Sequence, residues 1–597
     1  MNTVRGKLVC FCFEMMKMIA GGWLLVLHIS IFLPSVCRIH AVSYDYSATT
    51  ECLIEPQRAQ YGGGIITNPD FTHGIQGWTV FGQGAVKEGI SNSGNRYIVA
   101  HGRSHPLDSI SQQVQLEKGK LYSFSAWVQI NGGRGNVAAV FKMSHGELVR
   151  GGHVTARNGC WSLLKGGVYA NISSRAEILF ESKNTEAEIW VDNVSLQPFT
   201  MEQWRSHQDE SIDKERLGKV RFEARYANGT AIEGAGFSIK QTKSDFPFGC
   251  SMNYHILSST DYQNWFVPRF RYTTFTNEMK WSSTEKIQGQ ENYTVADAMV
   301  SFAQQNSISI RGHNIFWANE NFQSEWVKNL TPDELRKAAE QRIESVVSKY
   351  KGKVIAWDVM NENLHYHFFE DKLGENASAE YYARAYQLDP STTMFMNEYN
   401  TIEDSRDEKA NPLNYMTKLD EILSYPGNQG ISAGIGLQGH FNSGQPDLLH
   451  MRTALDSLGS TGLPIWLTEV NVVVDDKNQT VQAEYLEQVL REGYSHPAVK
   501  GIIMFAGPAN AEFDKTVLAD KDFKNTPAGD VVDKLIDEWK FQTKEIKADG
   551  KGSIEIPLFH GDYNITVKDP VSSSLTAFSY KMTKEVTGDT VHLRINA

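Results

Sequence analysis

The segment LPIWLTEVNV, Leu463 to Val472, has the pattern of a buried strand until it turns polar at Thr468, Glu469 and Asn471. Its apolar half has the length and composition of a strand that is covered on both faces, as the strands of parallel sheets are. A single glutamate at the end of such a strand is most often a surface group or an ion-pair partner. Whether Glu469 is more than that depends on how the neighbouring strands end.

Eight apolar runs of this kind lie between Phe246 and Gly507, and amphipathic stretches such as 331–351 and 480–494 separate them. The apolar spacing of those stretches fits helices that cover a sheet. Strands that alternate with helices eight times predict a (β/α)₈ barrel, an α/β fold. The runs are FPFGCSMNY, FRYTTFTNEMKW, SISIRGHNIFW, KVIAWDVMNEN, TTMFMNEYN, GIGLQGHF, LPIWLTEVNV and VKGIIMFAG.

Polar side chains follow these runs at successive strand ends. Because the carboxyl ends of parallel barrel strands form one face, these side chains are expected to share a cavity. Two carboxylates stand out, Glu362 after the fourth run and Glu469 after the seventh, on opposite sides of the ring. Paired acids are what acetal cleavage needs. The full set is Asn277, Lys280, His313, Asn361, Glu362, Asn397, Tyr399, Gln438, His440 and Glu469.

The composition of the chain limits the classes of ligand that can be expected. The chain has 597 residues, 41% of them apolar, a formal net charge of -12 and no long basic block. Clustered Lys and Arg would be needed to bind phosphate backbones, so nucleic acid is not expected as a partner. A neutral ligand fits better.

Changes in the residue pattern along the chain predict five parts. Short β-rich runs with Gly, Asn and Ser between them indicate an antiparallel, jelly-roll-like sandwich before the barrel. The charged stretch from Thr200 to Lys219 is expected to be a linker or an exposed helix. A small β appendage is expected to form from the region 219–243 and the end of the chain. The division is 1–41 leader, 62–199 sandwich, 200–245 linker and β segment, 246–540 barrel, 541–597 C-terminal β segment.

Five linked motifs in the barrel resemble those of glycoside hydrolase family 10, the endo-β-1,4-xylanases. They are RGHNIFW, WDVMNEN, MFMNEYN, LQGH and WLTEV, in this order on successive strands, and the resemblance covers about 246–540. The sandwich similarly resembles a carbohydrate-binding module of family 22, and that module ahead of this barrel is an arrangement of plant xylanases.

The resemblance implies a retaining hydrolysis of internal xylan bonds, with xylan or a related polysaccharide as partner. Glu362 resembles the general acid/base and Glu469 the nucleophile, whose carboxyl groups in retaining enzymes lie about 5 to 5.5 Å apart. Asn361 is expected to bond the sugar 2-hydroxyl and His440 to orient Glu469. The expected substrate-binding side chains are Asn277, Lys280, His313, Trp317, Asn397, Tyr399, Gln438 and Phe505.

Most of these positions also have an ordinary structural interpretation. The two histidines could be hydrogen-bonded core residues, Trp317 barrel packing, and Lys280 an ion-pair partner. Asn397 and Tyr399 could cap loops. For the two glutamates the alternative is a site that has lost its activity.

Five positions depart from the family pattern. Thr276 stands where many members have Glu, and Ala318 where they commonly have His. Phe505 and Phe513 stand at two positions where Trp is usual, so they keep a stacking face and lose the indole N–H. Asn471 replaces an Asp that supports the histidine beside the nucleophile. These changes leave two rival functions open: a non-catalytic or weakly active wall-polysaccharide-binding protein, and a xylan transglycosylase using the same glutamates.

The N-terminal run Met18 to Val36 predicts a secretory signal, cleaved near Ala41, or an uncleaved membrane anchor. The protein is therefore expected outside the cell or in the cell wall, with a membrane partner only in the anchored case. Eight glycosylation sequons support export. They begin at Asn171, Asn193, Asn228, Asn292, Asn329, Asn376, Asn478 and Asn564.

Beyond the leader the cysteines are Cys52, Cys160 and Cys250, which allow at most one disulfide within the chain. The reaction is expected to need no cofactor and no catalytic metal. A structural calcium in the sandwich is an expectation from the resemblance, without a ligand pattern that establishes it. The large aromatics of the sandwich, Trp78, Trp127, Trp161, Tyr169 and Trp190, are expected in its core rather than against a glycan, Trp190 above all.

Overall fold

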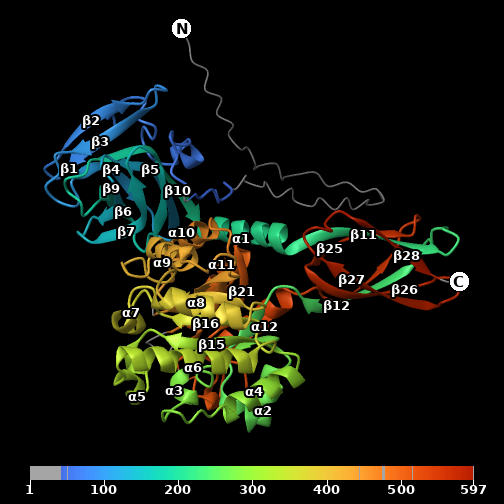
Figure 1. Ribbon diagram of the computed structural model, residues 1–597. Coiled ribbons are helices and arrows are strands. Elements are labelled where there is room, and N and C mark those ends of the chain that lie inside the picture. Colours follow the sequence, from blue (N-terminus) through green and yellow to red (C-terminus); the bar gives the residue numbers. More distant parts are fainter. Residues whose placement is uncertain (1–41, 50, 443, 474–477, 514, 596–597) are drawn as a thin grey trace, which may run out of the picture. The chain divides into compact units, whose positions relative to one another are not determined.

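The computed structural model describes residues 42–595 except 50, 443, 474–477 and 514 (Figure 1). The predicted leader, 1–41, lies outside the described residues. From Ser43 onward the chain forms one compact unit with three large hydrophobic cores. Within the described residues, no helix has the length and apolar character needed to cross a membrane.

The first core lies between two five-stranded antiparallel sheets, so the predicted sandwich is confirmed. One sheet has the order β1 (Thr79–Phe81), β4 (Ser109–Leu116), β9 (Ser174–Glu181), β6 (Arg134–Met143), β7 (Leu148–Arg157). The other has the order β2 (Ala85–Ile90), β3 (Arg96–His101), β10 (Ile189–Thr200), β5 (Lys120–Ile130), β8 (Ser162–Tyr169).

Residues before 62, left unassigned in the sequence division, belong to this module. Leu53 pairs with Trp161, and Cys52 is disulfide-bonded to Cys160, which is the one intramolecular bridge that the cysteine count allows. Cys250, in the barrel, is buried and free. The N-terminal segment is thus fixed to the outer face of the second sheet.

The prediction that Trp190 lies in the sandwich core is wrong. Its neighbours Ile189 and Val191 are buried in that core, so the period-two alternation of β10 turns Trp190 to the opposite face. There it stacks on Tyr97, with ring centroids 5.0 Å apart, beside Trp161. The alternation indicated a strand correctly but does not by itself say which face is the core.

The charged stretch after the sandwich is the helix α1 (Met201–Arg216), and its description as exposed needs correction. Thr200 and Gln203 form a capping box at its start. One face is buried against α11 (Gln479–Ser495), where the Trp204 indole donates a hydrogen bond of 2.8 Å to Glu492. Most of the charged residues lie on the other face and conceal this amphipathic pattern, although Arg216 is buried.

The second core belongs to a parallel barrel, as predicted. Its strands follow each other in hydrogen-bonding order, and the first two are joined by a bridge between Met252 and Phe275, which brings the ends of the sheet together. The strands are β13 (Phe248–Cys250), β14 (Tyr272–Thr274), β15 (Ser309–Trp317), β16 (Ala356–Asn361), β17 (Thr393–Glu398), β18 (Ala433–Leu437), β20 (Ile465–Val472) and β21 (Val499–Met504); the short β19 (His440–Phe441) pairs with β20.

Helices between the strands cover the barrel (Figure 1). In α6, Pro332 occupies the first turn behind a Thr331–Glu334 capping box, and an apolar stripe is buried against the strands. The longer ones are α4 (Thr294–Gln305), α6 (Pro332–Tyr350), α8 (Ala377–Leu388), α9 (Pro412–Ser424), α10 (Leu448–Gly459), α11 and α12 (Pro527–Glu538); α2 (Thr260–Phe266), α3 (Trp281–Thr284), α5 (Glu325–Lys328) and α7 (Phe368–Leu373) are short.

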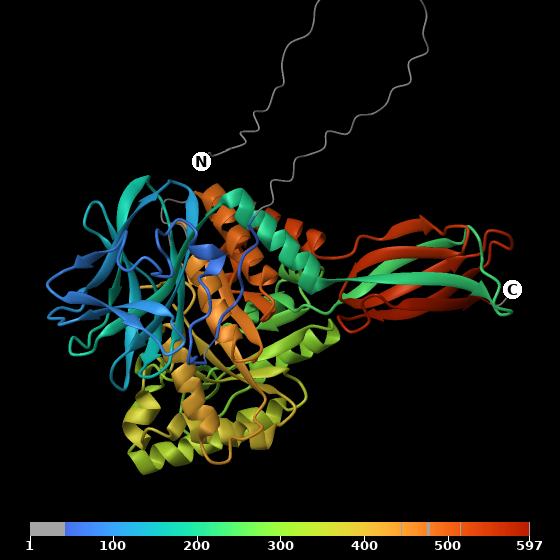
Figure 2. The same ribbon diagram turned by 90° about the horizontal axis from the view of Figure 1, so that it is seen from above.

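The third core confirms the β appendage. Strands from before and after the barrel pair in it, and Figure 2 shows them running side by side. One sheet has the order β25 (Ser553–Phe559), β11 (Leu217–Tyr226), β28 (Thr590–Ile595); the other has the order β24 (Lys544–Lys547), β12 (Gly236–Ser244), β26 (Gly561–Lys568), β27 (Leu575–Met582).

The module is joined to the barrel through buried charges. Lys165 on β8 lies 2.8 Å from Asp456 on α10, and their side chains are 3% and 1% exposed. Tyr44 and His496 also bond Asp456, at 2.7 and 3.0 Å. Leu448 and Leu449 of α10 pack beside them in a small apolar cluster with Tyr44 and other residues of the module side.

Candidate active site

The predicted site residues come from the carboxyl ends of the barrel strands. Glu362 directly follows β16 and has a positive φ of 61°, a conformation that non-glycine residues adopt rarely. Its backbone N–H bonds Asn397 O at 2.9 Å, which ties the turn to β17. The side chain is 8% exposed and accepts bonds from Trp317 Nε1 at 2.6 Å and Gln438 Nε2 at 3.1 Å. Residues at the ends of two strands thus hold the carboxyl group, and a third strand holds the backbone of Glu362.

Glu469 lies within β20 and is 7% exposed. Asn397 Nδ2 donates to its Oε1 at 2.8 Å and to Asn361 Oδ1 at 2.9 Å, so one amide connects the nucleophile candidate with the residue before Glu362. On the other side, His440 Nε2 lies 3.4 Å from Glu469 Oε2. The residues that the sequence placed together by strand order are therefore connected by direct contacts.

The surroundings shift the pKa values of the two carboxyl groups in opposite directions. Burial raises the pKa of Glu362, as does the negative charge of Glu469, against the hydrogen bonds from Trp317 and Gln438. Burial also opposes the charge of Glu469, but the pKa of this carboxyl group is lowered well below its usual range by His313, His440 and Lys280. One group is therefore poised to hold a proton and the other to stay ionised, as paired glycosidase acids require.

His313 contacts neither glutamate directly. Its Nδ1 lies 2.8 Å from Asp358 Oδ2, and Arg311 donates to Oδ1 of the same carboxylate at 2.6 Å. All three side chains are at most 3% exposed. Because Asp358 holds Nδ1, the other ring nitrogen of His313, Nε2, is the one available to the cavity.

Lys280, Asn277 and Trp317 form one edge of the site. Lys280 Nζ donates to Asn277 Oδ1 at 2.9 Å and lies 4.4 Å from the centre of the Trp317 ring. The other face of Trp317 is stacked on Phe322 at 3.8 Å. Burial lowers the pKa of Lys280, while Glu469 and Glu362 raise it. These polar and aromatic groups are of the kinds that bind sugar hydroxyls and ring faces.

Two of the positions that depart from the family pattern, Asn471 and Phe505, lie in this site as well. Asn471 Nδ2 is 2.8 Å from His440 Nδ1, and the Phe505 ring meets the imidazole edge to face at 5.8 Å. Phe513 is buried beside Phe505, and Thr276 and Ala318 are buried too. Apart from the half-buried Phe505, the side chains at all of these positions are buried.

Sequence reasoning missed a second set of charges next to the acid. His365 lies between two carboxylates, with Nδ1 2.7 Å from Glu398 Oε1 and Nε2 2.9 Å from Asp407 Oδ2. Glu398 also accepts a bond of 2.8 Å from the N–H of Leu364. Burial raises the pKa of Glu398 to about 6. The motif MFMNEYN contains this glutamate, but only Asn397 and Tyr399 were singled out from it.

Tyr399 does not contact either catalytic candidate. Its ring is stacked on His365, with centroids 3.9 Å apart. A third carboxylate, Glu403, was also missed: it accepts bonds from the N–H groups of Gly439 and His440 at 2.7 and 2.9 Å. It therefore holds the backbone of the loop that presents His440.

In the part of the chain that the structure describes, no group of three or more His, Cys, Asp and Glu side chains is suited to hold a metal ion. The calcium expected in the sandwich stays a prediction. Of the module aromatics, Trp78 packs in the main core, whereas Trp127 and Trp161 are buried in the small outer cluster with Tyr97 and Trp190.

Comparisons with known proteins agree with the two large parts of the chain. Glycosyl hydrolase family 10 matches residues 238–532, and a carbohydrate binding domain matches residues 63–148. Endo-1,4-beta-xylanase 5-like of Arabidopsis thaliana is 45% identical over 566 residues, which are 93% of this chain and 94% of that protein. Endo-1,4-beta-xylanase 5 of the same plant is 44% identical over 96% of this chain and 98% of its own length.

Among solved structures, xylanase 10B of Thermotoga petrophila RKU-1 in complex with xylobiose is 24% identical, covers 49% of this chain and 94% of its own, and has a TM-score of 0.44. The barrel, with glutamates at the ends of its fourth and seventh strands, defines the class of protein as a glycoside hydrolase. With relatives that match over nearly its whole length, the chain belongs to glycosyl hydrolase family 10.

Proposed function

We propose that the protein is an endo-β-1,4-xylanase that hydrolyses internal bonds of xylan with retention of configuration. One observation carries the proposal: burial and charge hold Glu362 toward the protonated form and Glu469 toward the ionised form in the same cavity. The names of the Arabidopsis relatives, at 44% and 45% identity, support xylan as the substrate.

In the first step, Glu469 attacks the anomeric carbon while Glu362 gives its proton to the glycosidic oxygen that leaves. The bond to the leaving sugar breaks as the bond to the Glu469 carboxylate forms. Trp317 and Gln438 hold Glu362 for this transfer, and Asn397 and His440 hold Glu469. Holding both groups before the reaction reduces the cost of orienting them in the transition state.

In the second step, Glu362 takes a proton from water, which attacks the same carbon and releases Glu469. Once Glu469 is esterified, it carries no negative charge to raise the pKa of Glu362. The pKa of Glu362 therefore falls, and the ionised carboxylate can act as the base. Both steps use only carboxyl groups of the chain and water. The proposed reaction therefore needs no cofactor.

The sugar before the cleaved bond is proposed to lie against Asn361, His313 and Lys280. Asn361 is held by Asn397, which also bonds Glu469, so a 2-hydroxyl placed there would lie beside the nucleophile. Such a bond strengthens catalysis only if it is tighter in the transition state. Phe505 beside His440 offers a smaller apolar floor than Trp.

The protein is also proposed to be a secreted glycoprotein of the cell wall. A disulfide between Cys52 and Cys160 is typical of oxidising compartments. Seven of the eight sequon asparagines are exposed, whereas Asn193 is buried at 8% exposure and bonds Asp192. The leader that would direct export lies outside the described residues.

The test is the release of new reducing ends from xylan by the purified protein and by its Glu469→Gln variant, which keeps the shape of the side chain. The parent is expected to release short oligosaccharides and the variant none. Equal, background rates would reject hydrolysis and favour a binding protein, for which Asn471 and Phe505 are the supporting departures. Labelled xylo-oligosaccharides added as acceptors would reveal transfer instead.

A further inference from the structure

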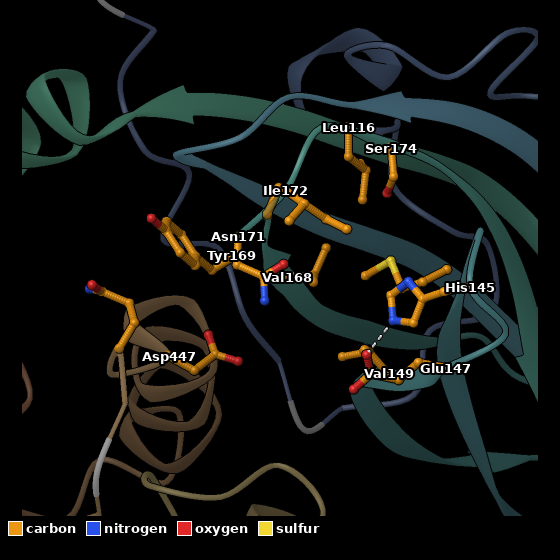
Figure 3. A pocket seen from close by; sticks show the side chains of 13 residues that line it. Leu116, His145, Glu147, Val149, Val168, Tyr169, Asn171, Ile172, Ser174 and Asp447 are labelled. Atoms are coloured by element: carbon orange, nitrogen blue, oxygen red, sulfur yellow. Dashed lines mark hydrogen bonds and ion pairs between the residues drawn. The ribbon is translucent and has the colours of Figure 1, made fainter. Parts of the chain in front are cut away.

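A hollow of 270 Å³ lies where the end of the sandwich meets the loop before α10 (Figure 3). The apolar side chains of Leu116, Met143, Val149, Val168 and Ile172 line it. Ile172 is 48% exposed although it belongs to this apolar wall. The volume is close to the lower end, about 300 Å³, of the range for small-ligand sites.

The rim of the hollow is polar and comes from both parts of the chain. His145 and Glu147 form a pair at 2.8 Å on the module side. Gln445 and Asp447, before and at the start of α10, face them from the barrel. A molecule seated here would meet apolar carbon at the base and hydrogen-bonding groups at the edge, as a sugar ring requires.

Asn171 is itself part of the lining, and its side chain projects into this space between Tyr169 and Ile172 (Figure 3). It begins the sequon Asn171-Ile172-Ser173, lies in the turn between β8 and β9, and is exposed. Its amide can therefore carry a glycan whose first sugar has a place beside it. Asn193 offers a contrast, because its side chain is buried within the module.

We propose that Asn171 is N-glycosylated and that the N-acetylglucosamine unit at the root of the glycan occupies this hollow. The Asn171 amide nitrogen forms a bond to the anomeric carbon of a lipid diphosphate-linked oligosaccharide, loses one proton, and the lipid diphosphate leaves. The seated sugar covers Ile172 and meets the barrel rim, so it acts as a fixed spacer between module and barrel. The inference rests on the proposed export of the chain.

The experiment uses the full chain secreted from a eukaryotic host. Mass spectrometry of peptides measures occupancy at Asn171, Asn193 and Asn228, and the native protein is then treated with peptide N-glycosidase. Occupancy is expected at Asn171 and Asn228 and not at Asn193. Asn228 lies in an exposed hairpin turn of the appendage, so its glycan should be released first. Release at Asn171 should be about tenfold slower, which corresponds to a binding free energy of about 1.4 kcal/mol for the sugar in the hollow.

Ile172→Thr keeps a sequon and removes the exposed apolar side chain of the wall, so it should shorten the delay of release at Asn171 relative to Asn228. Ile90→Thr, at a 59% exposed isoleucine of the same module outside the hollow, is the matched control and should leave the delay unchanged. Bare Asn171 beside occupied Asn228 would overturn the modification alone. Equal release rates at Asn171 and Asn228 in the parent would show that the sugar does not occupy the hollow. Absence of glycan at all sites of the secreted chain would overturn this inference, whereas a chain that its own leader fails to bring into the medium would reject export.

Discussion

Asn471 supports His440 through an amide, with Nδ2 2.8 Å from Nδ1 of the imidazole, while the other ring nitrogen faces Glu469 at 3.4 Å. Since an amide N–H₂ group only donates, Nδ1 must accept and the ring proton must lie on Nε2. With this tautomer, the neutral ring gives Glu469 a hydrogen bond, and protonation of Nδ1 requires the Asn471 amide to turn its oxygen toward the ring. Burial lowers the pKa of His440, while Glu469, Glu403 and the contact with Asn471 raise it, with a net rise; an amide adds no negative charge of its own to that of the carboxylates.

Asn471→Asp is therefore expected to move the pH dependence of activity. A carboxylate would accept a proton from Nδ1 and favour the imidazolium, whose charge lowers the pKa of Glu469 further. Because Glu469 must be ionised to attack, the acid limb of kcat/KM should shift downward by about one pH unit. Asn414→Asp, at a half-buried position of α9 away from His440, controls for added charge. Superimposable profiles for parent and Asn471→Asp would show that the amide does not set this limb.

Glu362→Ala tests the acid and the stereochemistry together. Xylan hydrolysis should fall about 10²- to 10⁴-fold, because no other group donates the proton to a poor leaving group. An aryl xylobioside with an acidic phenol needs little protonation, so it should still form the Glu469 ester. Azide should then restore turnover and yield the β-glycosyl azide, measured by nuclear magnetic resonance. An α-azide, or no rescue at all, would argue against a covalent intermediate on Glu469.

The sequence predicted the barrel because each strand shows its own run of buried residues and each polar end follows directly. Contacts between groups far apart in the chain were less visible. The pair Lys165 and Asp456 is separated by 291 positions, and nothing around either residue signals the other. His365 was missed for the same reason, since its partners belong to a different strand: Glu398 ends β17 and Asp407 lies in the loop after it. Trp190 shows the opposite case, in which local alternation was correct but the choice of face depended on what covers each sheet.

His365→Asn should destabilise the protein by about 3 kcal/mol near pH 6, because it leaves two carboxylates close together without their cation. Burial lowers the pKa of His365, but Glu398 and Asp407 raise it above its usual value. The stability gained from this raised pKa is fully present below pH 6.5, the unfolded value, and is lost as pH rises through the folded pKa. The difference in free energy of unfolding between parent and variant should thus shrink at alkaline pH.

The control for that measurement is His367→Asn, two residues on, where the side chain is exposed. It should unfold like the parent at every pH. A constant difference between parent and His365→Asn from pH 5 to pH 9 would indicate that the histidine acts through packing and not through its charge.

The junction of module and barrel gives the last prediction. Asp456 is buried and bonds Lys165, Tyr44 and His496; although burial raises the pKa of Asp456, Lys165 and His496 lower it well below its usual value. Lys165→Met leaves this carboxylate without its cation and should cost about 3 to 5 kcal/mol. Lys165→Met combined with Asp456→Leu removes both charges, so it should recover much of the loss.

Because the pKa of Asp456 is lowered, its stabilisation is present above the unfolded value near 3.9 and fades as pH falls through the folded one. Calorimetry at pH 7 compares the three proteins. If the double variant is less stable than Lys165→Met, the junction depends on hydrogen bonds of Asp456 to Tyr44 and His496 more than on the ion pair.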